Sequence, residues 1–327
     1  MKSAIYMDGK RFAETSFTTE EDFEREVKEN SQTLFGQKTI YLDIKNKIAT
    51  KTLGNSIPDG FLFNFKNEDD PEFYLVEVEL EKHDFDGHIF PQIKKFFTFF
   101  KNQKGRDELI GKLFEFIKQN PQTEQKFKEF LGNREIYKTI KDVVENNQNI
   151  LLIIDENKPQ FEETSDTITE WAKFVRVEIL KKYTADEKNI FVLNPDFEEI
   201  SSVEQFSPEP EKSETVYTEN FHMEGVDQFI ISIYNEIKDR ILEIDTNIKI
   251  NPTKYYISLR KDKNFVFFNI KRKKIWVSVP IPYNVLINIV KNYKTYDRGN
   301  YTDILIENND NLEEIVKIIE EAYKLQN

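Results

Sequence analysis

Two kinds of apolar periodicity follow one another in the first hundred residues of the chain. Thr19, followed by a run of acidic residues, is typical of a helix start and predicts a helix over 19–30. Apolar residues recur at helical spacing again from 87 to 100. Between these helices, runs rich in β-branched and aromatic residues predict three strands, near 38–43, 60–65 and 72–80.

The next hundred residues continue with a different pattern. Helical patterning with many charges runs from 105 to 147 and predicts a helical insertion. Beyond it we expect, in order, a fully buried central strand at 150–154, a helix near 165–172, and a strand hairpin near 175–179 and 189–193. A first domain of mixed strands and helices therefore spans residues 1–195.

The chain changes character after residue 195. Residues 196–220 are acidic and rich in Pro and Ser, which predicts a linker. Residues 221–327 predict a smaller α+β domain, and two domains suit a chain of 327 residues. Its expected elements are helices at 226–244, near 285–291 and from 311, with strands near 254–259, 265–271, 274–279 and 303–307.

Composition narrows the class of protein. The chain has 28 Phe and 14 Tyr, enough for buried cores, so its 32% of charged residues are expected on a solvated surface. Zero cysteines exclude disulfides, thiolate zinc sites and a cysteine nucleophile. The net charge of −13 argues against a protein that coats nucleic acid without specificity, although it leaves room for a local basic groove.

The sequence also bears on location. No run of eighteen apolar residues occurs, and the first ten residues lack the apolar core of a signal peptide. We therefore expect neither membrane insertion nor export, and a cytoplasmic location.

Three carboxylates are expected to converge near the second and third strands. Asp59 opens the strand at 60–65, and Glu77 and Glu79 lie two residues apart on the next strand. Strand alternation directs both glutamates to one face. Like charges held together raise each other's pKa, and a divalent cation offsets that repulsion. The alternative is a solvent-facing strand edge whose acids only keep the protein in solution.

These residues resemble a known motif. Pro58-Asp59 followed by Glu77-Val78-Glu79 resembles the PD-(D/E)XK nuclease superfamily, over residues 18 to 195. The superfamily usually has Lys where this chain has Glu79, and a Glu-x-Glu form occurs in some of its restriction endonucleases. The resemblance implies an α/β, restriction-endonuclease-like mixed sheet flanked by helices. It also implies Mg²⁺, with Mn²⁺ as a substitute, held by Asp59, Glu77 and Glu79, and leaves the general base open.

The same resemblance implicates residues on two helices. Glu24 matches the acidic residue that many superfamily members place on the first helix to touch the metal site, although the neighbouring glutamates offer the same chemistry. Gln92 matches a Gln-x-x-x-Tyr pattern that lines the active site, with Phe96 in place of the Tyr. His88 shares the helical face of Gln92 and could contact a phosphate. His83 is a weaker candidate, and packing or capping is the alternative for both histidines.

Basic residues form two further candidates for nucleic-acid contact. Lys94 and Lys95 could supply the basic group that the motif lacks, or could simply be solvated. The one dense basic cluster, here named the basic hairpin, could track a phosphate backbone or be a solvated strand tip. Its members are Arg260, Lys261, Lys263, Lys271, Arg272, Lys273 and Lys274.

The C-terminal domain has a resemblance of its own. The segments 255–257 and 265–268, Tyr-Tyr-Ile and Phe-Val-Phe-Phe, resemble an uncharacterised domain often attached to predicted nucleases. The chain is thus expected to be a Mg²⁺-dependent nuclease that hydrolyses DNA in preference to RNA, in restriction or defence. The alternative is an inactive descendant that binds nucleic acid or protein. Cutting both strands would call for a homodimer, and the C-terminal domain could bind a protein partner.

Overall fold

The computed structural model describes residues 3–44, 57–68, 70–197 and 217–326. It divides the chain into two compact units, Met1–Glu204 and Gln205–Asn327. Most of the predicted linker at 196–220 lies outside the described residues. None of the helices in the described ranges combines the length and apolar character needed to cross a bilayer.

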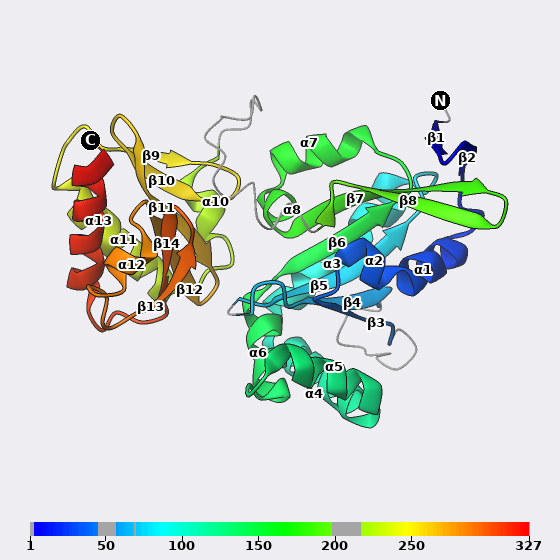
Figure 1. Cartoon of the computed structure of the whole chain (residues 1–327), viewed down its shortest axis with the longest axis horizontal. Helices are drawn as coiled ribbons and strands as arrows, with labels where there is room; N and C mark the ends of the chain where they lie inside the picture. Colours follow the sequence, from blue (N-terminus) through cyan, green and yellow to red (C-terminus); the bar gives the residue numbers. More distant parts are fainter. Residues whose placement is uncertain (1–2, 45–56, 69, 198–216, 327) are drawn as a thin grey trace. The chain divides into compact units, whose positions relative to one another are not determined.

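The N-terminal unit is built on an eight-stranded mixed sheet with the order β1-β2-β7-β6-β5-β4-β3, and β8 also pairs with β7 (Figure 1). Strands β5, β6 and β7 are parallel to one another, and the other pairs are antiparallel. The strands are β1 Ala4–Met7, β2 Lys10–Thr15, β3 Thr39–Leu42, β4 Gly60–Asn64, β5 Glu72–Glu79, β6 Asn149–Ile154, β7 Val175–Ala185 and β8 Lys188–Asn194. The predicted mixed sheet is confirmed.

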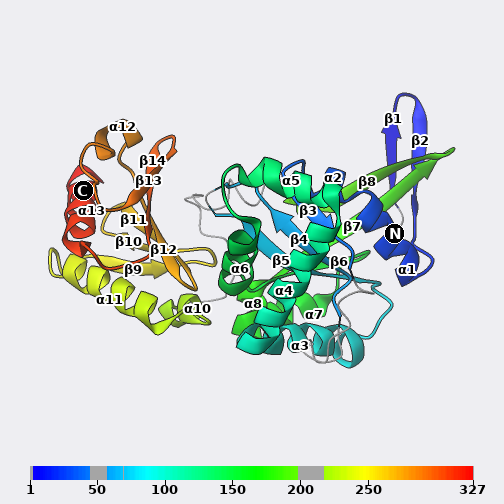
Figure 2. The ribbon, with the colours of Figure 1, turned by 90° about the horizontal axis from the view of Figure 1, so that it is seen from below.

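Helices cover both faces of this sheet (Figures 1 and 2). Strand alternation sends Val76 and Val78 into one apolar core with residues of α1 and α2, and sends Leu75 into a second core with residues of α3 and α4. The helices are α1 Glu20–Glu29, α2 Ser31–Phe35, the π-helix η2 Phe85–Ile89, α3 Phe90–Lys101, α4 Gln103–Gln119, α5 Pro121–Leu131, α6 Ile136–Asn146, α7 Pro159–Thr167 and α8 Thr169–Phe174. Helices α4 to α6 occupy the segment expected to be a helical insertion.

The structure of this unit differs from the prediction in two places. The single helix expected near 165–172 is wrong, because two helices occupy this segment. Helix α7 starts at Pro159, which suits a first helical turn, and Ile168 separates it from α8. The hairpin of β1 and β2 was not predicted. Its turn residues Asp8 and Gly9 both have positive φ, 52° and 73°, and Asp-Gly is a strong signal for such a turn.

The C-terminal unit contains a six-stranded antiparallel sheet with the order β13-β14-β12-β11-β10-β9. Helices α11 and α13 contribute to its apolar core. Its elements are α10 Glu219–Met223, α11 Gln228–Leu242, β9 Lys249–Pro252, β10 Ile257–Arg260, β11 Asn264–Lys271, β12 Lys274–Val279, α12 Tyr283–Leu286, β13 Lys294–Arg298, β14 Tyr301–Ile306 and α13 Leu312–Gln326. A separate, β-rich C-terminal region is therefore present.

Two predicted elements of this unit also differ from the structure. The helix expected near 285–291 is only the short α12, which ends at Leu286. The strand expected from 254 begins at Ile257, because Thr253 bonds the carbonyl of Tyr256 through both its backbone N–H and its hydroxyl and forms a turn there.

Candidate functional site

The acidic residues of the motif lie in the interior of the sheet. Glu77 and Glu79 lie on β5 between β4 and β6, with exposed fractions of 4% and 0%. Asp59 directly precedes β4 and is also buried. The register pairs Gly60 with Val76, and continuing it by one residue sets Asp59 beside Glu77. The alternative of a solvent-facing strand edge is wrong.

A single amide joins the two glutamates. The side-chain nitrogen of Gln92, on α3, donates to Glu79 Oε1 at 2.8 Å and to Glu77 Oε1 at 2.5 Å. The amide is assigned in this sense because the opposite orientation would turn its oxygen toward the two carboxylates. Both glutamates therefore face the α3 side of the sheet, as strand alternation predicted, and Gln92 holds them together.

Asp59 is oriented by the backbone of β5. Its Oδ2 accepts a hydrogen bond from the Val78 N–H at 2.8 Å, so its carboxylate is fixed at the amide between the two glutamates. A charge-assisted bond of this kind is stronger than one between neutral groups. The start of β4 is thereby tied to the two acidic positions of β5.

Tyr41 on β3 packs against Gly60, the residue that follows Asp59. A Cβ added to Gly60 would lie 2.2 Å from the Tyr41 hydroxyl oxygen, so the phenol packs directly on this glycine. Burial raises the pKa of Tyr41 well above its ordinary value, and the charges of Asp59, Glu24 and Glu77 raise it further. Glu24 thus contributes to the negative field around Tyr41.

Two histidines engage the carboxylate of Glu79. His83 Nδ1 lies 2.6 Å from Glu79 Oε2, and His88 Nε2 lies 3.2 Å from Glu79 Oε1. The two imidazole rings meet edge to face, with centroids 5.0 Å apart. His88 reaches this position from the π-helix η2, in which the Ile89 N–H bonds back to the Asp84 carbonyl.

Glu20 joins this group from the first turn of α1. Its Oε2 lies 3.4 Å from His83 Nδ1. One ligand atom from each of Glu20, Glu79, His83 and His88 lies within 4.8 Å of the others. Burial raises the pKa of Glu79, while the bond from His83 and the charge of His88 act in the opposite direction. We name these four residues the His-Glu cluster. Glu20 was not predicted as a site residue, although it lies one helical turn before Glu24.

The other basic candidates lie on exposed surfaces. Lys94 and Lys95 are exposed on α3, and Lys95 follows Gln92 by three residues, close to the same helical face. Within the basic hairpin, Lys261 forms an ion pair with Asp245 at 2.8 Å. Ion pairing of this kind neutralises part of the charge that the sequence suggested was available.

Arg272 of the basic hairpin is paired as well, with its Nε 3.4 Å from Asp227 Oδ1. Lys274 stands over the ring of Trp276 at 5.7 Å from its centroid. Lys271 and Lys274 lie opposite each other where β11 and β12 meet, and Arg260 is exposed at the end of β10. The turns that carry these residues, between β10 and β11 and between β11 and β12, lie at opposite ends of β11. The single basic cluster expected from the sequence is therefore wrong, and its charge is divided between two partly balanced groups.

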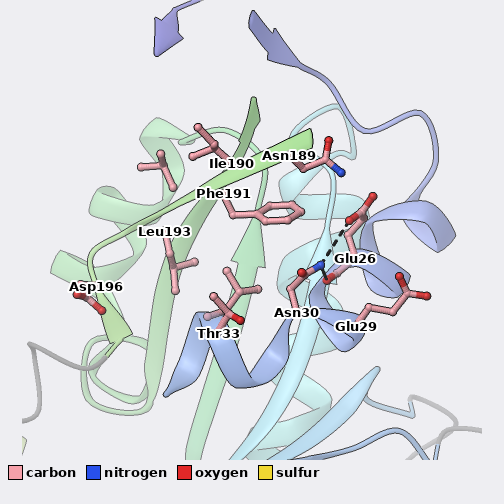
Figure 3. A pocket seen from close by; sticks show the side chains of 11 residues that line it. Glu26, Glu29, Asn30, Thr33, Asn189, Ile190, Phe191, Leu193 and Asp196 are labelled. Carbon is pink, nitrogen blue, oxygen red and sulfur yellow. Dashed lines mark hydrogen bonds between the residues drawn. The ribbon is translucent and has the colours of Figure 1, made fainter. Parts of the chain in front are cut away.

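A hollow of about 800 Å³ lies between the α1–α2 segment and β8 (Figure 3). The ring of Phe191 reaches into it from β8, and Glu26 and Asn30 face it from α1 and its C-terminal end. Glu26 forms an ion pair with Lys182 at 2.5 Å. The acidic residues of the motif and the His-Glu cluster do not line this hollow, so it is separate from the candidate site.

Comparisons with known proteins concern a minor part of the chain. Residues 219–326 match a family described as a domain of unknown function (DUF5655). An uncharacterized protein of Haemophilus influenzae (strain ATCC 51907 / DSM 11121 / KW20 / Rd) is 36% identical over 116 residues, which are 33% of this chain and 38% of that protein. The match therefore spans about two fifths of that curated relative. No solved structure matches the chain. The function of the N-terminal unit must be inferred from its own residues.

Proposed function

We propose that the N-terminal unit is a metal-dependent phosphodiesterase of the PD-(D/E)XK type that cleaves DNA in preference to RNA. The observation that carries this proposal is the placement of Asp59 beside Glu77, with Glu79 two residues further along the same buried strand face. The order of the three acids along the chain follows the motif, and the pairing of β4 with β5 brings Asp59 beside Glu77. The setting in restriction or defence is part of the same proposal.

The donor set suits Mg²⁺, or Mn²⁺ in its place. Asp59 and Glu77 offer carboxylate oxygens on adjacent strands, and Mg²⁺ prefers oxygen ligands. Burial of several like charges is unfavourable unless cations or hydrogen bonds offset it. When bound, the metal would polarise the scissile phosphate and lower the pKa of the attacking water. Asp59, Glu77 and Glu79 would hold it, with Glu24 as a ligand through water.

The surrounding side chains have their own roles in this proposal. Gln92 keeps the Glu77 and Glu79 carboxylates in fixed orientations through its two hydrogen bonds. Glu79 would bind a second metal ion or accept the proton of the attacking water, and His83 and His88 both contact its carboxylate. His88 has 46% of its side chain exposed, which places an imidazole at the outer limit of the site.

Substrate would be held by positive charge outside the acidic core. We propose that Lys94 and Lys95 on α3 and the basic residues at the two ends of β11 in the C-terminal unit contact phosphate. Contacts of this kind position the backbone without reading sequence. A homodimer would supply two sites for cutting both strands, and the C-terminal unit would bind substrate or a protein partner.

A second candidate function is a non-catalytic module that binds nucleic acid or protein. Glu79 stands where a Lys is usual in the superfamily, and both of its carboxylate oxygens contact histidine. An acid engaged in this way could serve packing rather than chemistry. In this reading the fold is kept for binding.

Cleavage assays separate the two functions. Wild type and Asp59→Ala would be incubated with linear, circular and single-stranded DNA and with RNA, in Mg²⁺, Mn²⁺ or EDTA. The matched control is Glu156→Ala, which removes a carboxylate that is 62% exposed and paired with Lys181. The nuclease proposal expects cleavage by wild type and Glu156→Ala, lost in Asp59→Ala and in EDTA. Cleavage that persists in Asp59→Ala would refute the site assignment, and none in wild type would favour the binding module.

A further inference from the structure

The His-Glu cluster has a different chemistry from the Asp59–Glu77 pair. Its four side chains come from three separate places in the chain: the first turn of α1, the last residue of β5, and the segment that leads into α3. Two imidazole nitrogens and two carboxylates converge within 4.8 Å. Imidazole nitrogen is a poor ligand for Mg²⁺ and a good one for Zn²⁺, Co²⁺ and other first-row transition ions.

The hydrogen bonds of the cluster leave this convergence incompletely explained. His83 Nδ1 faces two carboxylates at once, Glu79 at 2.6 Å and Glu20 at 3.4 Å. A single N–H on Nδ1 can form a well-aligned hydrogen bond with only one of these carboxylates. The longer contact, to Glu20, is therefore weak. A dication in place of the proton would contact both carboxylates and both imidazoles together.

The local structure holds the four groups before any ligand arrives. Glu79 is fully buried, and Gln92 donates to its Oε1, which sets the orientation of the carboxylate. The hydroxyl of Thr19 caps α1 by accepting from the Asp22 N–H at 3.1 Å, which fixes the turn that carries Glu20. Partners of this kind, bonded to the ligands themselves, are typical of metal sites.

We propose that Glu20, Glu79, His83 and His88 form a binding site for a first-row transition-metal dication of the Zn²⁺ or Co²⁺ type. The site shares Glu79 with the proposed Mg²⁺ ligands, and its other three residues are different. It does not depend on the nuclease proposal, because metal binding can be measured with no nucleic acid present. The ligand that α1 supplies to this second site is Glu20.

Cobalt titration gives a direct test, because Co²⁺ bound by nitrogen and oxygen ligands absorbs visible light. Full-length protein stripped with EDTA and dialysed would be titrated with Co²⁺, and Zn²⁺, Mg²⁺ and Ca²⁺ would be compared by calorimetry. We expect one Co²⁺ or Zn²⁺ per chain, bound roughly a hundredfold or more tightly than Mg²⁺, a difference of about 3 kcal/mol.

Matched variants locate the ion. Glu20→Gln and His88→Ala change partly exposed side chains and are expected to fold, and each should weaken Co²⁺ binding by roughly tenfold or more. Glu21→Gln, at the exposed carboxylate next to Glu20 on the same helix, and Glu156→Gln, at a carboxylate that is 62% exposed, should leave Co²⁺ binding unchanged. The variants are checked for folding by circular dichroism.

Three results would overturn the inference: no preference for Co²⁺ over Mg²⁺, binding that survives both Glu20→Gln and His88→Ala, or binding weakened as much in Glu21→Gln as in Glu20→Gln. The test is distinguishable from that of the proposed function. Co²⁺ binding without cleavage of any substrate would leave this site standing and refute the nuclease. Cleavage in Mg²⁺ without Co²⁺ binding would do the reverse.

Discussion

The stability of the N-terminal unit should depend on pH through Glu178, a buried acid on β7. Its side chain has no exposed surface, and Arg176 Nη2 lies 2.6 Å from its Oε1. Burial raises the pKa of Glu178 to about 7, although the charge of Arg176 and its hydrogen bond act in the opposite direction. Arg176 also packs over the ring of Phe197, 4.3 Å from its centroid, so it keeps a partner if Glu178 is neutralised.

The sign of the effect follows from proton binding. The ordinary pKa of the group is 4.5, so between pH 4.5 and 7 the folded protein binds more protons at Glu178 than the unfolded chain does. The resulting stabilisation is fully present below pH 4.5 and is lost as the pH rises through 7. The difference between 4.5 and about 7 corresponds to about 3 kcal/mol, which is the upper limit of the change in unfolding free energy. Glu178→Gln removes this titration.

Urea unfolding of wild type and Glu178→Gln at pH 5 and pH 8 measures the effect. Fluorescence of Trp171 reports on the N-terminal unit alone when Trp276 is replaced by Phe in both proteins. From pH 5 to pH 8, Glu178→Gln should gain about 2–3 kcal/mol relative to wild type. Glu156→Gln, at a carboxylate that is 62% exposed, is the control and should show no such gain. A difference between wild type and Glu178→Gln that stays constant with pH would refute the reasoning.

Three further predictions concern the site and its supports. Gly60→Ala should cost about 1–3 kcal/mol of unfolding free energy, because its Cβ would lie 2.2 Å from the Tyr41 hydroxyl oxygen. Adding Tyr41→Ala should recover part of this loss, and purely additive losses in a double-mutant cycle would contradict the clash. Thr19→Ala should cost about 1 kcal/mol in urea unfolding by removing the α1 cap, and an unchanged midpoint would argue against that cap. Gln92→Leu should lower the melting temperature in EDTA by removing the donor shared by two buried acids, and Mg²⁺ should raise the melting temperature of this variant more than that of wild type. Equal Mg²⁺ shifts would contradict this last expectation.

Short-range periodicity was sufficient where the site lies on regular elements. Strand alternation predicted that Glu77 and Glu79 share a face, and their common hydrogen bonds to Gln92 confirm it. Helical spacing placed His88 and Gln92 on one side of a helix, and both contact Glu79 in the structure. These predictions succeed because a period of two or about four residues fixes the direction of a side chain.

Turns, the π-helix and tertiary packing could not be predicted from sequence periodicity. His83 reaches Glu79 through a turn after β5, in which the His83 N–H bonds the Leu80 carbonyl at 2.9 Å. The direction of His88 was predicted, but not the π-helix that carries it. Glu20 and Glu24 offer the same chemistry, and the packing of α1 against β5 places Glu20 beside His83. The burial of Glu178 is also tertiary, since an acid on a strand is ordinarily expected to face water.

The proposed nuclease activity depends on the Glu77 carboxylate, which lies beside Asp59. The most direct measurement is the single-turnover cleavage rate of an end-labelled DNA duplex in Mg²⁺ by wild type and by Glu77→Gln, which keeps the shape of the side chain and removes its charge. We expect cleavage by wild type and a loss of roughly a hundredfold or more in Glu77→Gln, about 3 kcal/mol in activation free energy. Equal rates for the two proteins, with both folded, would contradict it.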